Sequence, residues 1–402
     1  MNRIATITLT LIAVAVACTR PVATADRQWT EQTTEVDTPT IVSTQEISSA
    51  DLLKRLMGAD FSIAGSVVVK KIHYQSTYNG KPIYLSGIVA LPNDNDTIRE
   101  IVISNHWTIC SDAECPSESW PMDIALCATR RAMVVCADYY GYGLTATQVH
   151  PYLDALSTAR HSTDCFRAAL LLCNSHNTLA TNYRTYNIGY SQGGAVALAV
   201  QRYIESNVAI DSVARIEKTL CGAGPYDPVA CYREYLNVDT LAYPIVVPMI
   251  IAGMKLSYPD MFENISESDF FSNEFNTAGI SDSVKSKQYT AEQLNSLICN
   301  AVGAATPRNI FSVASLDSTS VISQKLLEAL ELNNLTTGWI PKHRVQFFHS
   351  TADVVVPIIN TQNALKAFGE CPTDSAIIAN MGTHNNAAML FYQQVLQNNI
   401  FE

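Results

Sequence analysis

The sequence predicts an α/β fold, with a mostly parallel central sheet, helices on both of its faces and a largely helical cap inserted before a late strand. Two observations lead to this prediction. Strand-like and helix-like patterns alternate up to about residue 231, as they do in βαβ units. At 189–193 a glycine-flanked turn joins a strand pattern directly to a helix pattern. The 402 residues, 48% of them apolar, are enough for one large domain plus an insertion.

The individual elements follow from local patterns. Two strands, 67–74 and 83–91, flank the turn dipeptide Asn79-Gly80 and predict a hairpin. Short apolar or β-branched runs predict further strands at 101–104, 132–137, 185–190, 216–222, 344–349 and 375–379. Apolar residues at helical spacing predict helices at 122–131, 154–173 and 194–205, and a further helix-like stretch follows Asn386 and runs through Gln397.

The alternation stops between residues 232 and 339, which we therefore expect to form the cap. The main domain would then consist of 49–231 and 340–402. Within the cap, residues 243–254 are apolar but too short and too interrupted by proline to span a bilayer. Two interpretations of this segment stay open: it forms the cap's own core, or it forms an apolar wall or lid over a binding site.

The turn at 189–193 has the pattern Gly-x-Ser-x-Gly, which presents a serine between a strand and a helix. A strained serine backbone brings the residues two before and two after it together, so Gly189 and Gly193 provide the room. The pattern predicts that Ser191 is a nucleophile. The alternative is a serine in an ordinary strand-to-helix turn.

A serine needs a base to take its proton and an acid to orient that base. In this architecture the acid follows one late strand and the histidine follows the last. Asp353 follows the strand at 344–349, and His384 follows the strand at 375–379, so we assign them as acid and base. Asp353 could instead cap a turn. His349 is the nearest rival to His384, but it precedes the acid and is expected to support the acid's turn.

An oxyanion hole needs two N–H donors. The backbone N–H of Gln192, directly after the nucleophile, is the expected first donor. The second should lie in the loop after the strand at 101–104, so we expect the backbone N–H of Trp107 or Thr108. His106 is expected to shape this loop.

Five motifs occur in order along the chain: ADYYGYG, which contains Asp138, GYSQGG around Ser191, GAGPYD from Gly222, HSTADVVVP around Asp353 and GTHNNAA around His384. Together they resemble the α/β-hydrolase superfamily, and within it the secretory lipase family and related bacterial esterases. The similarity spans about residues 67–397. It implies an α/β-hydrolase fold and an ester-hydrolysing activity, without fixing the acyl chain or the alcohol. One departure is Trp107, where the oxyanion loop of such enzymes often has glycine.

The amino terminus predicts export. Residues 1–17 combine a positive start, an apolar run and small residues before Cys18, as in a signal peptide. The cysteine at this position resembles a bacterial lipoprotein signal, in which Cys18 is lipidated; simple cleavage is the alternative. The polar residues 18–48 are expected to form a flexible tether. The protein would then be periplasmic and anchored to the outer membrane, or secreted.

Eleven cysteines less Cys18 leave ten, an even number, so disulfides are expected in an oxidising compartment. Cys110 with Cys115, and Cys221 with Cys231, are close enough in sequence to pair. No spacing typical of a metal site or a dinucleotide fingerprint occurs, so neither metal nor cofactor is expected. A formal charge of −11 argues against nucleic acid and against polyanionic substrates.

These observations favour an exported serine esterase or lipase acting on a small ester or lipid, with a membrane contact only through a lipid anchor at Cys18. A serine peptidase on the same fold is one alternative, although no charged anchor for a peptide terminus is identified in the cap. A surface binding lipoprotein that has lost catalysis is the other. The order of Ser191, Asp353 and His384 argues against that second alternative.

Overall fold

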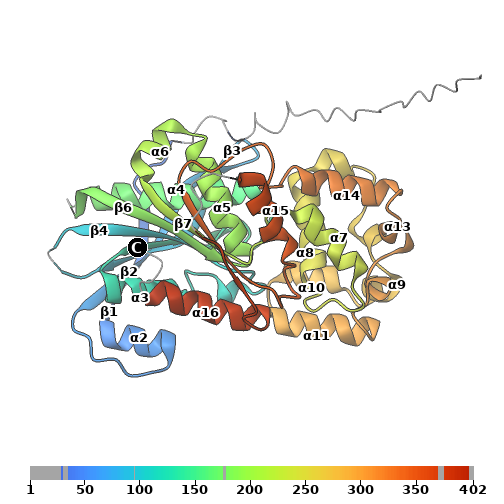
Figure 1. Cartoon of the computed structure of the whole chain (residues 1–402), viewed down its shortest axis with the longest axis horizontal. Coiled ribbons are helices and arrows are strands. Elements are labelled where there is room, and N and C mark those ends of the chain that lie inside the picture. The colour runs from blue at the N-terminus through green and yellow to red at the C-terminus, as the bar shows by residue number, and fades with distance from the viewer. Residues whose placement is uncertain (1–28, 30–34, 95, 175–177, 370–374, 398–402) are drawn as a thin grey trace, which may run out of the picture.

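One large sheet organises the molecule (Figure 1). The computed structural model describes residues 29, 35–94, 96–174, 178–369 and 375–397. In these residues nine strands form a single sheet in the order β1-β2-β3-β5-β4-β6-β7-β8-β9. The strands are β1 (Thr40–Ser48), β2 (Ser66–Tyr78), β3 (Lys81–Pro92), β4 (Ile98–Asn105), β5 (Met133–Ala137), β6 (Leu179–Tyr190), β7 (Ile216–Gly222), β8 (Arg344–Ser350) and β9 (Ile377–Ala379).

The first three strands form an antiparallel meander, and the six strands from β5 to β9 are parallel to one another. Helices accompany the parallel strands, because such strands need crossover connections. The α-helices are α2 (Ser49–Met57), α3 (Ala125–Arg130), α4 (Ala155–Asn174), α5 (Gln192–Glu205), α6 (Val208–Ala214), α7 (Pro228–Asn237), α8 (Val246–Ser257), α9 (Asn273–Thr277), α10 (Ile280–Ser286), α11 (Ala291–Val302), α12 (Pro307–Ile310), α13 (Val313–Leu316), α14 (Val321–Glu331), α15 (Ile359–Phe368) and α16 (His384–Leu396). Short 3₁₀ turns are η1 (Asp112–Glu114), η2 (Met122–Ile124), η3 (Gly143–Thr145), η4 (Pro259–Phe262) and η5 (Glu267–Phe270).

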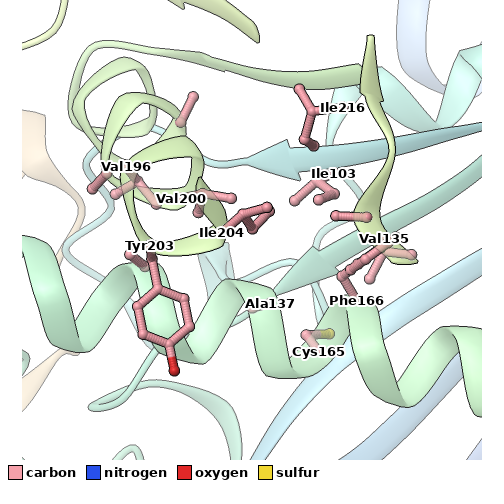
Figure 2. Close-up of a cluster of buried hydrophobic side chains, with 14 of the residues drawn as sticks. Ile103, Val135, Ala137, Cys165, Phe166, Val196, Val200, Tyr203, Ile204 and Ile216 are labelled. Carbon is pink, nitrogen blue, oxygen red and sulfur yellow. The ribbon is translucent and has the colours of Figure 1, made fainter. Parts of the chain in front are cut away.

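The sheet has an apolar core on each face. Figure 2 shows part of the first, where Phe166 of α4 and Val200 and Ile204 of α5 lie near Ile103 and Val135 of the sheet. The second core lies between the opposite face and helices α2, α3 and α16. The prediction of a mostly parallel sheet with helices on both faces is therefore confirmed.

The predicted hairpin is present and is longer than expected. Strands β2 and β3 pair from Val67 opposite Pro92 to Tyr78 opposite Lys81. Asn79 and Gly80 both have left-handed backbone, with φ of 49° and 70°. This is the geometry that an Asn-Gly hairpin turn requires, because two-residue turns of the matching twist need positive φ at both positions.

Strand β1 differs from the sequence prediction. Residues 40–48, which we expected within the flexible tether of 18–48, pair antiparallel with β2 along the sheet edge. Nearly all side chains of β1 are exposed, so the strand lacks the alternation of buried and exposed positions by which a strand is usually recognised. The predicted signal peptide, Cys18 and most of the rest of the tether lie outside the described residues.

Helices fill the chain between β7 and β8, where the cap was expected. Helix α7 begins at Pro228, four residues before the expected cap boundary of 232. The apolar segment 243–254 contains most of α8, whose residues are buried in a third apolar cluster together with those of α7, α9, α11 and α14. Within the described part of the chain, no helix is both long and apolar enough to cross a bilayer.

The expected disulfides are absent: nine cysteines fall within the described residues, and all nine are free thiols. Cys110 packs in the third apolar cluster, which we call the cap cluster, with its sulfur 3.8 Å from that of Met249, whereas Cys115 lies in a separate small cluster. Cys221 belongs to the main core, whereas Cys231 belongs to the cap cluster. Each pair is thus close in sequence but points into different cores.

Asp123, in η2, is a buried acid with an incomplete set of partners. One carboxylate oxygen accepts a hydrogen bond from Ser104 at 2.6 Å, and the other has no hydrogen-bond partner among the described residues. Burial raises the pKa of Asp123 to about 6, and the Ser104 hydrogen bond opposes this only in part.

Because the folded-state pKa of Asp123 lies above its unfolded value, the free energy of unfolding should fall as the pH rises from about 4 to about 6. We expect the free energy of unfolding of Asp123→Asn, measured in urea, to exceed that of the wild type by about 1–3 kcal/mol at pH 8. The difference should shrink at pH 4.5. Asp239→Asn, at an exposed site, is the control and should change little. A variant less stable than wild type at pH 8 would contradict this account.

Candidate active site

Four loops at one edge of the sheet carry the residues expected to act together. The segment His106–Thr108 follows β4, Ser191 follows β6, Asp353 follows β8 and His384 follows β9. All four strands are parallel, and with β7 between β6 and β8 they lie in the order β4-β6-β7-β8-β9. Parallel strands place their carboxyl ends at the same edge, where α/β proteins commonly bind ligands.

The backbone at Ser191 is strained. Its φ of 59° and ψ of −126° lie in a region that costs a side-chain-bearing residue about 1–3 kcal/mol. A hydrogen bond of 2.8 Å from its N–H to the carbonyl of Gly222, at the end of β7, helps to hold it. A Cβ on Gly189 would collide with the carbonyl of Gly193, and one on Gly193 would collide with the carbonyl of Asn105. Both glycines are therefore required, as the pattern predicts.

His384 and Asp353 form a direct pair. The imidazole Nδ1 lies 2.5 Å from Oδ2 of Asp353, so Nδ1 carries the proton that it donates to the carboxylate. His384 is the first residue of α16, and Tyr190, next to Ser191, donates to its carbonyl at 2.8 Å. The pairing leaves Nε2 as the nitrogen available for proton exchange.

Asp353 is buried yet held as a carboxylate. Its Oδ1 accepts from the backbone N–H groups of Val355 and Val356, each at 2.9 Å. Burial alone would raise its pKa, but the imidazoles of His349 and His384 and the Val356 amide outweigh it and lower the pKa well below its usual range. His349 supports the turn as expected, since its Nε2 donates to the carbonyl of Val356 at 2.9 Å.

The loop after β4 is fixed by His106. Its Nδ1 donates to the carbonyl of Trp107 at 2.7 Å, and its ring stacks on Tyr139 with centroids 4.0 Å apart. In a trans peptide the C=O and N–H point in opposite directions, so this bond turns the N–H of Thr108 away from His106. Burial lowers the pKa of His106 to about 4, which keeps the ring neutral. His106 thus shapes the loop.

Gln192 is tied to a second buried histidine. The Nδ1 of His150 donates to the carbonyl of Tyr140 at 2.8 Å, which leaves its Nε2 to accept from the side-chain amide of Gln192, also at 2.8 Å. Burial lowers the pKa of His150 to about 3, so it stays neutral. The first turn of α5 is therefore anchored to the segment that follows β5.

One cavity of about 1330 Å³ brings these residues together. Ser191, Gln192, Trp107, Thr108 and His384 all line it, and Asp353 lies behind His384 with only 7% of its surface exposed. Most other lining side chains are apolar. In the part of the chain that the structure describes, no group of three or more His, Cys, Asp or Glu side chains is arranged to hold a metal.

No protein-family model matches the chain, and no curated protein matches it in sequence. Solved structures do match. The rice cell wall degrading esterase LipA from Xanthomonas oryzae superposes with a TM-score of 0.72 at 18% identity, covering 90% of this chain and 96% of that one. Candida antarctica lipase A in its closed state superposes with a TM-score of 0.59 at 14% identity, covering 89% and 82%. The chain has the α/β-hydrolase fold.

A protein from Legionella pneumophila is similar as well, with a TM-score of 0.70 at 20% identity, covering 89% of this chain and 96% of that one. The fold that the ordered motifs implied is therefore confirmed. At these identities the similarity establishes the α/β-hydrolase architecture alone.

Within this α/β-hydrolase fold, two features of the site were not predicted. The sequence assigned no role at the site to His150, which is buried against Gln192. The one signal in the sequence is its position among closely spaced tyrosines, Tyr139, Tyr142 and Tyr152, whose rings surround it. The second feature is the part of the cavity formed by α2 and α16, which no local pattern could indicate.

Proposed function

We propose that this protein is an exported serine hydrolase that cleaves carboxylic esters through an acyl-enzyme on Ser191. One observation carries the proposal: a serine in a strained turn and a histidine paired with a buried carboxylate line the same cavity. This combination supplies a nucleophile, a base and an orienting acid.

In the proposed mechanism, Ser191 Oγ attacks the ester carbonyl while its proton passes to Nε2 of His384. Asp353 stabilises the resulting imidazolium, which its low pKa allows because the carboxylate stays ionised. The tetrahedral intermediate then breaks its bond to the alcohol oxygen, which receives the proton from His384. Water enters, gives a proton to His384 and attacks the acyl carbon, and the acid leaves as Ser191 regains its proton.

Two backbone N–H groups would stabilise the oxyanion. We assign the N–H of Gln192 and, of the two candidates in the other loop, the N–H of Thr108, because the His106 hydrogen bond turns that group away from the imidazole. Each well-placed donor of this kind contributes about 3 kcal/mol to the stability of the transition state.

The hydrogen bond between His150 and the Gln192 side chain should hold the first donor in place. We expect Gln192→Leu, which keeps the backbone N–H but loses this bond, to lower kcat about tenfold with little change in KM, since complete loss of a donor costs about 10²–10³. Gln362→Leu, at an exposed site on α15, is the matched control. A KM effect without a kcat effect would show that Gln192 acts on substrate binding instead.

The apolar character of the cavity favours an ester or lipid substrate over a highly charged one. The names of the similar proteins, a rice cell wall degrading esterase and a lipase, support the same substrate class. We further propose export, from the signal-like residues 1–17, and a lipid anchor at Cys18 as the only membrane contact.

The proposal can be tested with p-nitrophenyl esters from acetate to long acyl chains, alongside a panel of peptide amides. We expect ester hydrolysis and covalent labelling of Ser191 by a fluorophosphonate probe, located by mass spectrometry. Cleavage of amides at rates above those of esters would favour the peptidase. If no ester is cleaved and the probe labels nothing, the proposal fails, and the binding lipoprotein becomes the favoured alternative.

A further inference from the structure

The cavity is larger than one small ester needs, and its lining residues beyond Ser191 fall into two groups. Its volume of about 1330 Å³ exceeds the range of about 300–1,000 Å³ of common ligand pockets. One arm, the cap arm, runs under the cap and is lined by Tyr235 of α7 and by Val246 and Ile250 of α8. The other, the trough, runs between α16 and the amino-terminal helix α2.

The trough follows one face of α16 over its whole length. Beyond His384 and Asn385, the cavity is lined by residues that recur every four positions: Ala388 and Met389, Tyr392 and Gln393, Leu396 and Gln397. Residues four apart share one face of a helix. At a rise of about 1.5 Å per residue, the 13 residues of α16 give the trough a length of roughly 18–20 Å. Figure 1 shows α16 running from the end near α11 toward α3.

The opposite wall of the trough comes from the amino-terminal part of the chain. Leu53 and Met57, one helical turn apart on α2, line it together with Phe61 and Ile63 in the segment that follows. The side chains that α2 and this segment contribute are uncharged. Met57 and Phe61 are 41% and 36% exposed, so this wall offers apolar surface that a ligand could remove from water.

Trp107 lines the trough beside Tyr392, the ninth residue of α16. Its indole comes from the loop that follows β4 and packs edge to face on Tyr392 of α16, with ring centroids 5.8 Å apart. The indole therefore connects the loop after β4 to the wall of the trough that α16 forms.

We infer that the trough binds the alcohol part of the substrate and that this alcohol is an extended apolar chain. The inference rests on the proposed ester hydrolysis. The leaving oxygen must lie within hydrogen-bond reach of His384, which protonates it. Because His384 is the first residue of α16, a chain attached to that oxygen enters the trough, and the acyl chain is left to the cap arm.

The size of the trough sets the length of the alcohol. With a C–C bond of about 1.5 Å and tetrahedral angles, each methylene of an extended chain advances about 1.25 Å, so a channel of this length holds on the order of 14 methylene groups. A methylene that leaves water for an apolar wall improves binding by up to about fourfold, and in an open trough by about twofold. Selectivity should therefore rise steadily with alcohol length.

The test uses two substrate series with the full chain. In the first, the acyl group is acetyl and the alcohol is ethyl, butyl, octyl or dodecyl; in the second, the alcohol is ethyl and the acyl chain varies. We expect kcat/KM of the wild type to rise about two- to fourfold per methylene in the alcohol series. This constant reports steps up to acylation, during which the alcohol is still present.

Ala388→Trp should fill the trough midway along α16 and lower the ratio of kcat/KM for octyl acetate to that for ethyl acetate at least tenfold. If Ala388→Trp folds poorly, Met57→Lys on the exposed wall of α2 is the alternative variant, and it should lower the same ratio. Val208→Trp, at a position 82% exposed on α6, is the size-matched control and should keep the wild-type ratio. Ile250→Trp in the cap arm should instead flatten the acyl series.

Two results would overturn the inference while leaving ester hydrolysis intact. One is a flat alcohol series in the wild type together with Ser191-dependent cleavage of ethyl esters. The other is that Ala388→Trp flattens the acyl series and leaves the alcohol series unchanged. That result would place the acyl chain in the trough. If the wild type cleaves no ester of either series, the proposed function fails and the inference fails with it.

Discussion

Replacing Ser191 by alanine is expected to lower kcat for ester hydrolysis by a factor on the order of 10⁵ to 10⁶. In the proposed mechanism the hydroxyl forms the acyl-enzyme, and the strained turn has no other nucleophile at this position. His384→Ala should cost nearly as much, and the double variant should be no slower than either single one, because the members of a triad act as a unit. Steady-state rates on p-nitrophenyl acetate measure all three.

Ser212→Ala, at an exposed site on α6, is the control for the serine substitution and should retain wild-type rates. Circular dichroism of each variant separates loss of chemistry from loss of fold. If His384→Ala kept most of the activity, the base would be misassigned. Additive losses in the double variant would indicate that Ser191 and His384 act in separate steps.

Replacing Asp353 by asparagine is expected to lower kcat by a factor on the order of 10⁴. The asparagine oxygen can still accept from the amides of Val355 and Val356, so the turn should persist. Its NH₂ group, however, would donate to Nδ1 of His384, and the proton of the imidazole would move to Nε2. An imidazole in that tautomer cannot accept the proton of Ser191.

This prediction also has a stability component. The pKa of Asp353 is lower in the folded state than in the unfolded one, so its ionisation stabilises the fold above the usual aspartate pKa, and that stability is lost as the pH falls through the folded-state value. Asp353→Asn should therefore be less stable than wild type at pH 7, and the difference should narrow in acid. Equal kcat in variant and wild type would remove Asp353 from the site.

The sequence indicated the proposed triad because two kinds of information agree there. The motifs around Ser191, Asp353 and His384 are local, and parallel strands necessarily bring their carboxyl ends to one edge. No long-range contact had to be guessed. The same argument located the loop containing Thr108, but the choice of donor needed the His106 hydrogen bond, which depends on the position of a side chain.

What the sequence could not indicate depends on contacts between distant segments. Helix α2 and helix α16 lie at opposite ends of the chain, and the sequence of neither helix indicates that it lies near the other. Together they nevertheless line the trough. Strand β1 was missed because edge strands with exposed side chains lack alternation. The prediction of disulfides was wrong for a related reason, because the spacing of two cysteines along the chain does not determine into which core each side chain points.

The free thiols have a consequence for how an exported chain would mature. Eight of the nine described cysteines are buried, and burial raises the pKa of Cys110, Cys115 and Cys231 to about 12. Only the thiolate reacts readily with oxidants and disulfides, so these thiols are unreactive in the folded protein. In an oxidising compartment, folding would then have to bury the thiols faster than they are oxidised. The yield of native protein would therefore depend on the folding rate.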